Sequence, residues 1–158
     1  MITFLTWFHV VAAVSWIGGM VFLSLVLVPV LRNPAVAPHR GLLFPLVARQ
    51  FRVVGWGAMG ILLASGPVLA AARGIDPGVP STWPTIFWIK MVLVAVLVGL
   101  SALHDLSVGP RVSGILRKPV GDRTPFEGQL VRWAPFLARC SLVLALSVLY
   151  CAVHLVRV

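Results

Sequence analysis

Charged residues are scarce in this sequence. Of its 158 residues, 11% are charged and 59% are hydrophobic, and the mean hydropathy is +1.01. A soluble domain of this length does not carry such values. The shortage of charge therefore excludes an ordinary soluble domain and indicates a membrane protein in contact with the lipid bilayer.

Several chemical motifs are missing as well. The only two cysteines, Cys140 and Cys151, lie about 16 Å apart along one predicted helix, so they cannot bridge each other. There is no Cys-x-x-Cys element and no dense methionine motif. The basic residues behind the net charge of +9 lie between apolar segments instead of forming a patch with interleaved aromatics. This distribution excludes nucleic acid as a partner.

The first apolar segment is long. Residues 2–31 contain no charged residue, and Arg32 ends the run. About 30 residues of helix are more than enough to cross the hydrocarbon core. The segment does not resemble a signal peptide, because it has no basic start and no small-x-small cleavage site follows it. We expect it to be a transmembrane helix.

Three further apolar segments follow, so the sequence predicts an all-α, four-helix transmembrane bundle in one domain, residues 1–158. Pro67 is expected to kink the second helix or to end it early. The predicted spans are 2–31, 53–72, 84–104 and 134–156.

The connections are expected to differ in structure. Residues 41–52 mix apolar side chains with arginines, which suits an interfacial helix leading into the second span. Residues 105–133 contain Gly109-Pro110 and further prolines and glycines, which predict irregular chain.

Basic residues also indicate the orientation. The 32–52 connection has four arginines and no acidic residue, whereas 73–83 has one basic and one acidic residue. The 105–133 connection again holds more basic than acidic residues. Short connections rich in lysine and arginine stay in the cytoplasm. We therefore expect an N-out, C-out, multi-pass protein of a bacterial-type cytoplasmic (inner) membrane.

Three ionisable side chains from different predicted helices then lie at similar height near the outer surface: His9, Lys90 and His154. A titratable group within a span is costly unless it faces protein, a ligand or water. His104, next to Asp105, lies instead at the cytoplasmic end of the third span, where it can mark a second site for a quinone or a proton.

Two cofactors suit the outer group. The first is haem b between helices, with His9 as an axial iron ligand and His154 or Lys90 as the second ligand. The second is copper, bound by imidazole together with Met20 and Cys151.

Alternatives without a cofactor are also open. His9 can simply hydrogen-bond a neighbouring helix, and Lys90 can extend to the headgroups. In that case the chain would be an accessory subunit of a larger membrane complex.

Two stretches resemble a known family. They are FHVVAAVSWIGGMVFLSLVLVPVLR and FWIKMVLVAVLVGLSALHDLSVGPR. The first contains a histidine, a Trp-x-Gly-Gly element and a later proline; the second contains a lysine and a His-Asp pair followed by Gly-Pro-Arg. Both resemble small membrane proteins of the copper-resistance D (CopD) domain family. They are more distantly similar to HemJ-type protoporphyrinogen oxidases.

The resemblance implies a function. HemJ-type proteins are haem-binding membrane oxidoreductases that pair a first-helix histidine with a lysine opening a later helix, and the matching positions are His9 and Lys90. Trp16 and His104 also fall on positions that look shared. The prediction is a haem b-binding redox or electron-transfer protein of the CopD-like class, with a quinone or another membrane redox partner.

Overall fold

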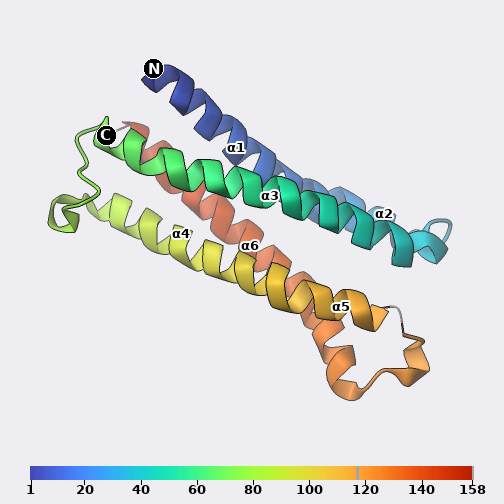
Figure 1. Ribbon diagram of the computed structural model, residues 1–158. Helices are drawn as coiled ribbons and strands as arrows, with labels where there is room; N and C mark the ends of the chain where they lie inside the picture. Colours follow the sequence, from blue (N-terminus) through green and yellow to red (C-terminus); the bar gives the residue numbers. More distant parts are fainter. Residues whose placement is uncertain (117, 158) are drawn as a thin grey trace.

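The computed structural model describes residues 1–116 and 118–157, without the side chains of Val120, Val156 and Arg157. Over this range the chain forms four long antiparallel helical segments (Figure 1), each long and apolar enough to cross a membrane. The elements in order are α1 (Ile2–Phe22), η1 (Leu23–Leu27), α2 (Val28–Val30), η2 (Ala37–His39), α3 (Arg40–Ala71), η3 (Pro80–Thr82), α4 (Thr85–Leu103), η4 (His104–Val108), α5 (Gly109–Leu116), η5 (Val120–Asp122) and α6 (Pro125–Arg157).

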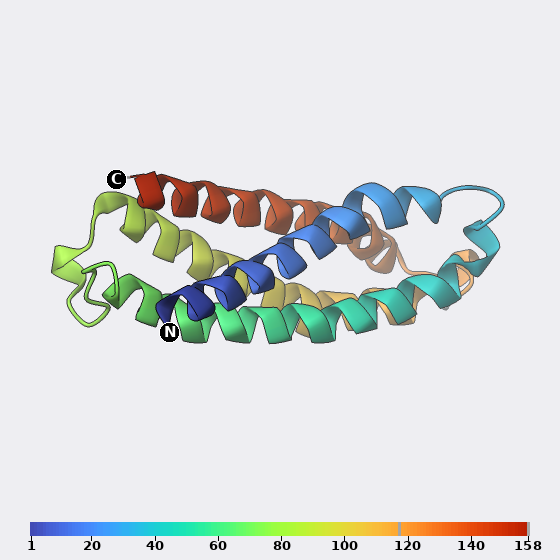
Figure 2. The same ribbon diagram turned by 90° about the horizontal axis from the view of Figure 1, so that it is seen from above.

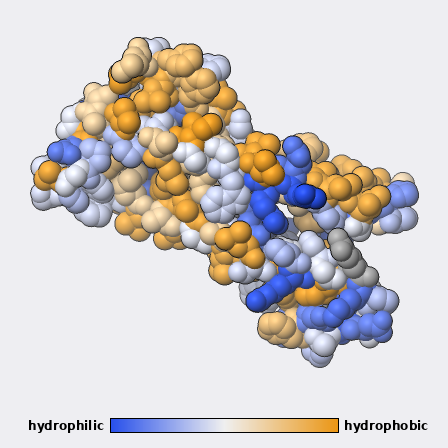
Figure 3. Space-filling view, in the orientation of Figure 1, coloured by the Kyte–Doolittle hydropathy of each residue, from blue (hydrophilic) through white to orange (hydrophobic). Residues whose placement is uncertain are grey.

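The two ends of the bundle differ. Both chain termini and the connection from α3 to α4 lie at one end, here named the termini end (Figure 1). The turn from α2 to α3 and the connection from α5 to α6 lie at the other end, here named the loop end. On the face drawn in Figure 3, hydrophilic residues gather toward the loop end, and apolar residues cover most of the rest.

The helices associate in two pairs. α1 packs mainly against α3, α4 packs mainly against α6, and α1 makes a smaller contact with α6. Figure 2 shows α1 crossing obliquely over the bundle. Many of the buried side chains are small, such as Ala12, Ala58 and Ala145, which lets helix backbones approach closely.

Large apolar side chains point outward along every long helix. Val14, Val53, Leu106 and Val143 are all more than 60% exposed. Exposing such an apolar surface to water is unfavourable, whereas lipid tails solvate it. The predicted all-α fold with four apolar membrane helices is confirmed.

The prediction of irregular chain over residues 105–133 is wrong for much of that range. The helix continues past Leu103 through the π-helical turn η4 into α5. Pro110 lacks an N–H, and its ring would clash with a carbonyl of the preceding α-helical turn. The wider π turn immediately before it relieves that clash. Pro29 follows η1 in the same way, so both π turns have the same cause.

α6 also starts earlier than the predicted span. Thr124 and Glu127 form reciprocal hydrogen bonds: the Glu127 carboxylate accepts from the Thr124 amide at 2.9 Å, and the Thr124 hydroxyl accepts from the Glu127 amide at 3.3 Å. This capping box satisfies two amides at the helix start. Lys118 donates to Glu127 at 2.6 Å and ties the connection to the cap.

The helix expected over residues 41–52 is the first part of one continuous helix, α3, which leads directly into the second span. Pro67 does not end this helix, which continues to Ala71. The chain turns at Gly74, whose φ of 76° is a left-handed conformation that favours glycine. The Ile75 amide donates back to the Ala70 carbonyl at 3.1 Å.

The α1–α3 contact contains one very close approach. A Cβ atom placed on Gly19 would overlap the ring of Phe51, whereas one placed on the adjacent Gly18 would have nothing within 4 Å. Only a residue without a side chain therefore fits at Gly19.

We expect Gly19→Ala to destabilise the protein relative to Gly18→Ala by about 1–3 kcal/mol, the usual range for overpacking. Both changes gain the same helix propensity, so their difference isolates the clash with Phe51. The measurement is the unfolding midpoint of each variant in the same detergent, monitored by circular dichroism. Equal midpoints would contradict this packing.

Candidate cofactor site at the termini end

The candidate site begins with a hydrogen-bonded histidine. His9 of α1 and Ser65 of α3 are joined by a hydrogen bond of 2.7 Å between Nδ1 and Oγ. Ser65 is only 3% exposed. Its hydroxyl donates to the backbone carbonyl of Ile61 at 2.6 Å. The hydroxyl thus connects the imidazole to the backbone of the neighbouring helix.

This chain of bonds determines the tautomer of His9. A serine hydroxyl has one proton, and Ser65 gives that proton to Ile61. Its oxygen therefore accepts from His9, which places the imidazole proton on Nδ1. In the neutral imidazole, the other ring nitrogen, Nε2, then keeps its lone pair. An imidazole held in this way at one nitrogen is the usual arrangement of a metal-ligating histidine.

Two glycines of α3 lie beside aromatic rings of α1. A Cβ atom on Gly66 would lie 3.9 Å from Cε1 of His9, an ordinary contact distance, so Gly66 is a close neighbour of the imidazole. Two helical turns further along α1, Trp16 lies against Gly55, where a Cβ would be 3.5 Å from the indole Cδ1. His9 and Trp16 thus both face α3, in agreement with their shared helix face in the sequence.

Two cations lie near the histidine. Lys90 of α4 and Arg73, just after α3, both lie within electrostatic range of His9, and Arg73 and Cys151 lie within range of Lys90. Lys90 is half-buried, and Arg73 is exposed. The site therefore draws on both helix pairs, with the histidine in one pair and the lysine in the other.

Aromatic side chains enclose the start of α4 next to this group. Phe87 is buried, and its ring lies 4.9 Å from that of Trp83, edge to face. Trp83 and Trp88 donate their indole N–H groups to backbone carbonyls of the α3–α4 connection at 2.7 and 3.1 Å. These bonds hold the connection over the first turns of α4, one turn before Lys90.

The other predicted site residues are more scattered. His154 is exposed on α6, at the same end as His9. Met20 lies about 16 Å from His9 along α1, so the two do not share one small site. His104 lies about 20 Å from Lys90 along its own helical segment and belongs to the loop end. Across residues 1–116 and 118–157, no three histidine, cysteine or acidic side chains gather as a metal-binding group.

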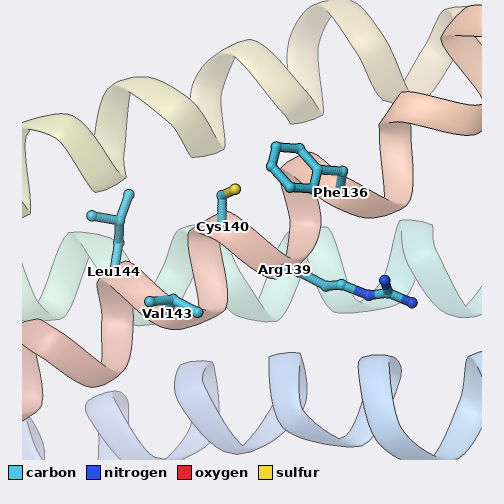
Figure 4. A pocket seen from close by; sticks show the side chains of 5 residues that line it. All are labelled: Phe136, Arg139, Cys140, Val143 and Leu144. Atoms are coloured by element: carbon cyan, nitrogen blue, oxygen red, sulfur yellow. The ribbon is translucent and has the colours of Figure 1, made fainter.

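A shallow open recess lies elsewhere, on α6. Figure 4 shows that all its labelled side chains belong to this one helix, between the ribbons of α4 and α1. Cys140 lies about 16 Å along α6 from Cys151, which is next to the candidate site. The recess is therefore separate from His9. It is lined by Phe136, Arg139, Cys140, Val143 and Leu144.

Ser65 and Arg73 were not predicted as site residues. A signal for Ser65 existed, because it is the only hydroxyl residue in the predicted span 53–72 and lies near the same outer end as His9. Arg73 is the one basic residue of the 73–83 connection, and its position in the sequence gives no signal for a site.

Comparisons with known proteins identify a relative but no family. The chain is 29% identical over 150 residues to an uncharacterized protein of Aquifex aeolicus (strain VF5), a match that covers 93% of this chain and 90% of that protein. No family model matches the chain. No solved structure matches it either.

We expect Ser65→Ala to remove the bond that holds the Nδ1–H tautomer of His9. The measurement is the ¹⁵N chemical shifts of labelled histidine, which distinguish the two tautomers. Ser141→Ala is the matched control, because Ser141 is also buried and donates to a backbone carbonyl one turn back on α6. Unchanged His9 shifts in Ser65→Ala would contradict the assignment.

Proposed function

We propose that this protein binds haem b at the termini end and acts as a membrane redox or electron-transfer protein of the CopD-like class. The observation that carries the proposal is the Ser65 bond to Nδ1 of His9, which leaves Nε2 free. A porphyrin supplies four of the iron ligands, so one oriented imidazole is enough to anchor it. A copper ion would need several protein ligands at one point.

The charges nearby also suit this cofactor. Haem carries two propionates, and Arg73 supplies a cation within electrostatic range of His9. Phe87 and Trp83 offer apolar aromatic surface at the start of α4. When bound, the haem would supply one-electron redox chemistry. The protein would orient the imidazole, neutralise the carboxylates and exclude water.

The second axial position has two candidates. Lys90 is half-buried and lies within range of His9, whereas His154 is exposed. We favour Lys90, and His154 or Arg73 would then meet a propionate. The same pair, His9 and Lys90, carries the resemblance to HemJ-type oxidases, which supports an oxidoreductase activity.

We expect His9→Ala to abolish the Soret band of the detergent-purified protein, because among the described residues of the termini end no other histidine is held at Nδ1. Ser65→Ala should weaken haem binding about 10- to 100-fold, as for other residues that orient a metal ligand. His39→Ala is the control, since His39 is exposed at the loop end. Absorption spectra, oxidised and then dithionite-reduced, provide the measurement.

Two results would overturn the proposal. An unchanged spectrum in His9→Ala would remove His9 from the site. A colourless wild-type protein with stoichiometric copper by elemental analysis would favour the copper alternative, and a protein with neither would favour an accessory subunit.

We also propose that the loop end faces the cytoplasm, because the 32–52 connection has four arginines and no acidic residue. In the double variant Cys140→Ala and Cys151→Ala, a cysteine at Ser81 should react with a membrane-impermeant maleimide in spheroplasts. A cysteine at Ala35 should react only after lysis. The reverse pattern would place the haem site on the inner side.

A further inference from the structure

A second polar cluster lies at the loop end, at the level of the π turn η4. It contains Arg52 of α3 with His104 and Asp105 of η4. Nδ1 of His104 lies 3.0 Å from Oδ1 of Asp105. The Nε atom of Arg52 is buried and has no hydrogen-bond partner. This cluster is far from His9 and takes no part in the haem proposal.

Gly109 lets Arg52 reach this position. A Cβ atom there would lie 3.3 Å from Nη2 of Arg52 and 3.2 Å from the carbonyl oxygen of His104. These contacts are tighter than a side chain normally accepts. The guanidinium of α3 is thus held against the segment that carries the His-Asp pair.

The hydrogen bonding of this cluster is incomplete. A guanidinium inside an apolar bundle is costly unless its donors find acceptors. The Asp105 oxygen nearest His104 already accepts from that imidazole, since a carboxylate can only accept. Among the described residues, Nε of Arg52 has no acceptor and no hydrogen bond joins Arg52 to the Asp105 carboxylate, so an acceptor oxygen from outside the cluster would complete the bonding of the guanidinium. Its side chain is only half-buried, so a ligand can approach the guanidinium end.

Charge and access narrow the choice of ligand. With His104 neutral, the charges of Arg52 and Asp105 cancel, so an uncharged acceptor fits better than a phosphate dianion. Leu103 and Leu106, which flank the His-Asp pair, are 53% and 69% exposed. The cluster is therefore next to a surface that faces lipid. An uncharged carbonyl group on a lipid-soluble ring satisfies both conditions.

We propose that Arg52, His104 and Asp105 bind the carbonyl head group of a lipophilic quinone. Arg52 donates to one carbonyl oxygen. Asp105 holds Nδ1 of His104, which leaves Nε2 facing away from the carboxylate and available to the ligand. This site goes beyond the haem proposal and does not rest on it.

The test is calorimetric titration of the purified full-length protein with ubiquinone-1, a short-chain quinone. Arg52→Gln and His104→Gln should each raise Kd about tenfold, the expected loss for one hydrogen bond to a charged or orienting group. Arg49→Gln is the matched control, because Arg49 is exposed on the same helix. It should leave Kd unchanged.

Arg52→Lys separates loss of ligand binding from loss of folding. It keeps the positive charge but loses the planar donor arrangement of the guanidinium. It should fold as the wild type does by circular dichroism and still bind more weakly. Equal Kd values for wild type and Arg52→Gln, or no binding by the wild type, would overturn the proposal.

Two further measurements separate the alternatives. In nanodiscs, phosphatidylglycerol that displaces ubiquinone-1 in an Arg52-dependent manner would assign the site to a lipid phosphate and overturn the quinone. His9→Ala should lose any Soret band but keep the wild-type Kd for ubiquinone-1. The haem and quinone proposals can therefore fail separately.

Discussion

A polar group inside a bilayer must find its partner within the protein, and the bond between His9 and Ser65 meets that requirement. It joins α1 to α3 at the termini end, and the Ser65 hydroxyl passes the constraint on to the backbone at Ile61. One nitrogen of the imidazole is thereby committed to structure. The other nitrogen takes no part in this bond, so it is the ring atom that would bind the proposed haem.

The packing between α1 and α3 supports the bond between His9 and Ser65. Large and small residues alternate across the contact: Trp16 lies on Gly55, and Phe51 lies on Gly19. In both contacts a large side chain of one helix meets a glycine of the other. Such close backbone approach sets the rotation of α1, and that rotation determines whether His9 meets Ser65 or faces lipid.

Each end of the bundle contains a polar side chain held by a contact between helices, but the two contacts differ. At the termini end, a neutral histidine is held by a hydroxyl, with cations nearby. At the loop end, a guanidinium lies against Gly109 beside a His-Asp pair, in a segment widened ahead of Pro110. The proline explains the π turn by sterics alone, and Nε of Arg52 is buried without a partner among the described residues.

The sequence by itself determined the four apolar helices and the shared face of His9 and Trp16, because these follow from hydropathy and helical period along one segment. It predicted the end of the third helical segment and the start of the fourth wrongly, because the π turn before Pro110 and the capping box at Thr124 extend these helices to Leu116 and from Pro125. Only the tertiary structure brought Ser65 to His9 and Arg52 to Gly109. Partners on different helices depend on rotation and register, which are set by packing and not by composition.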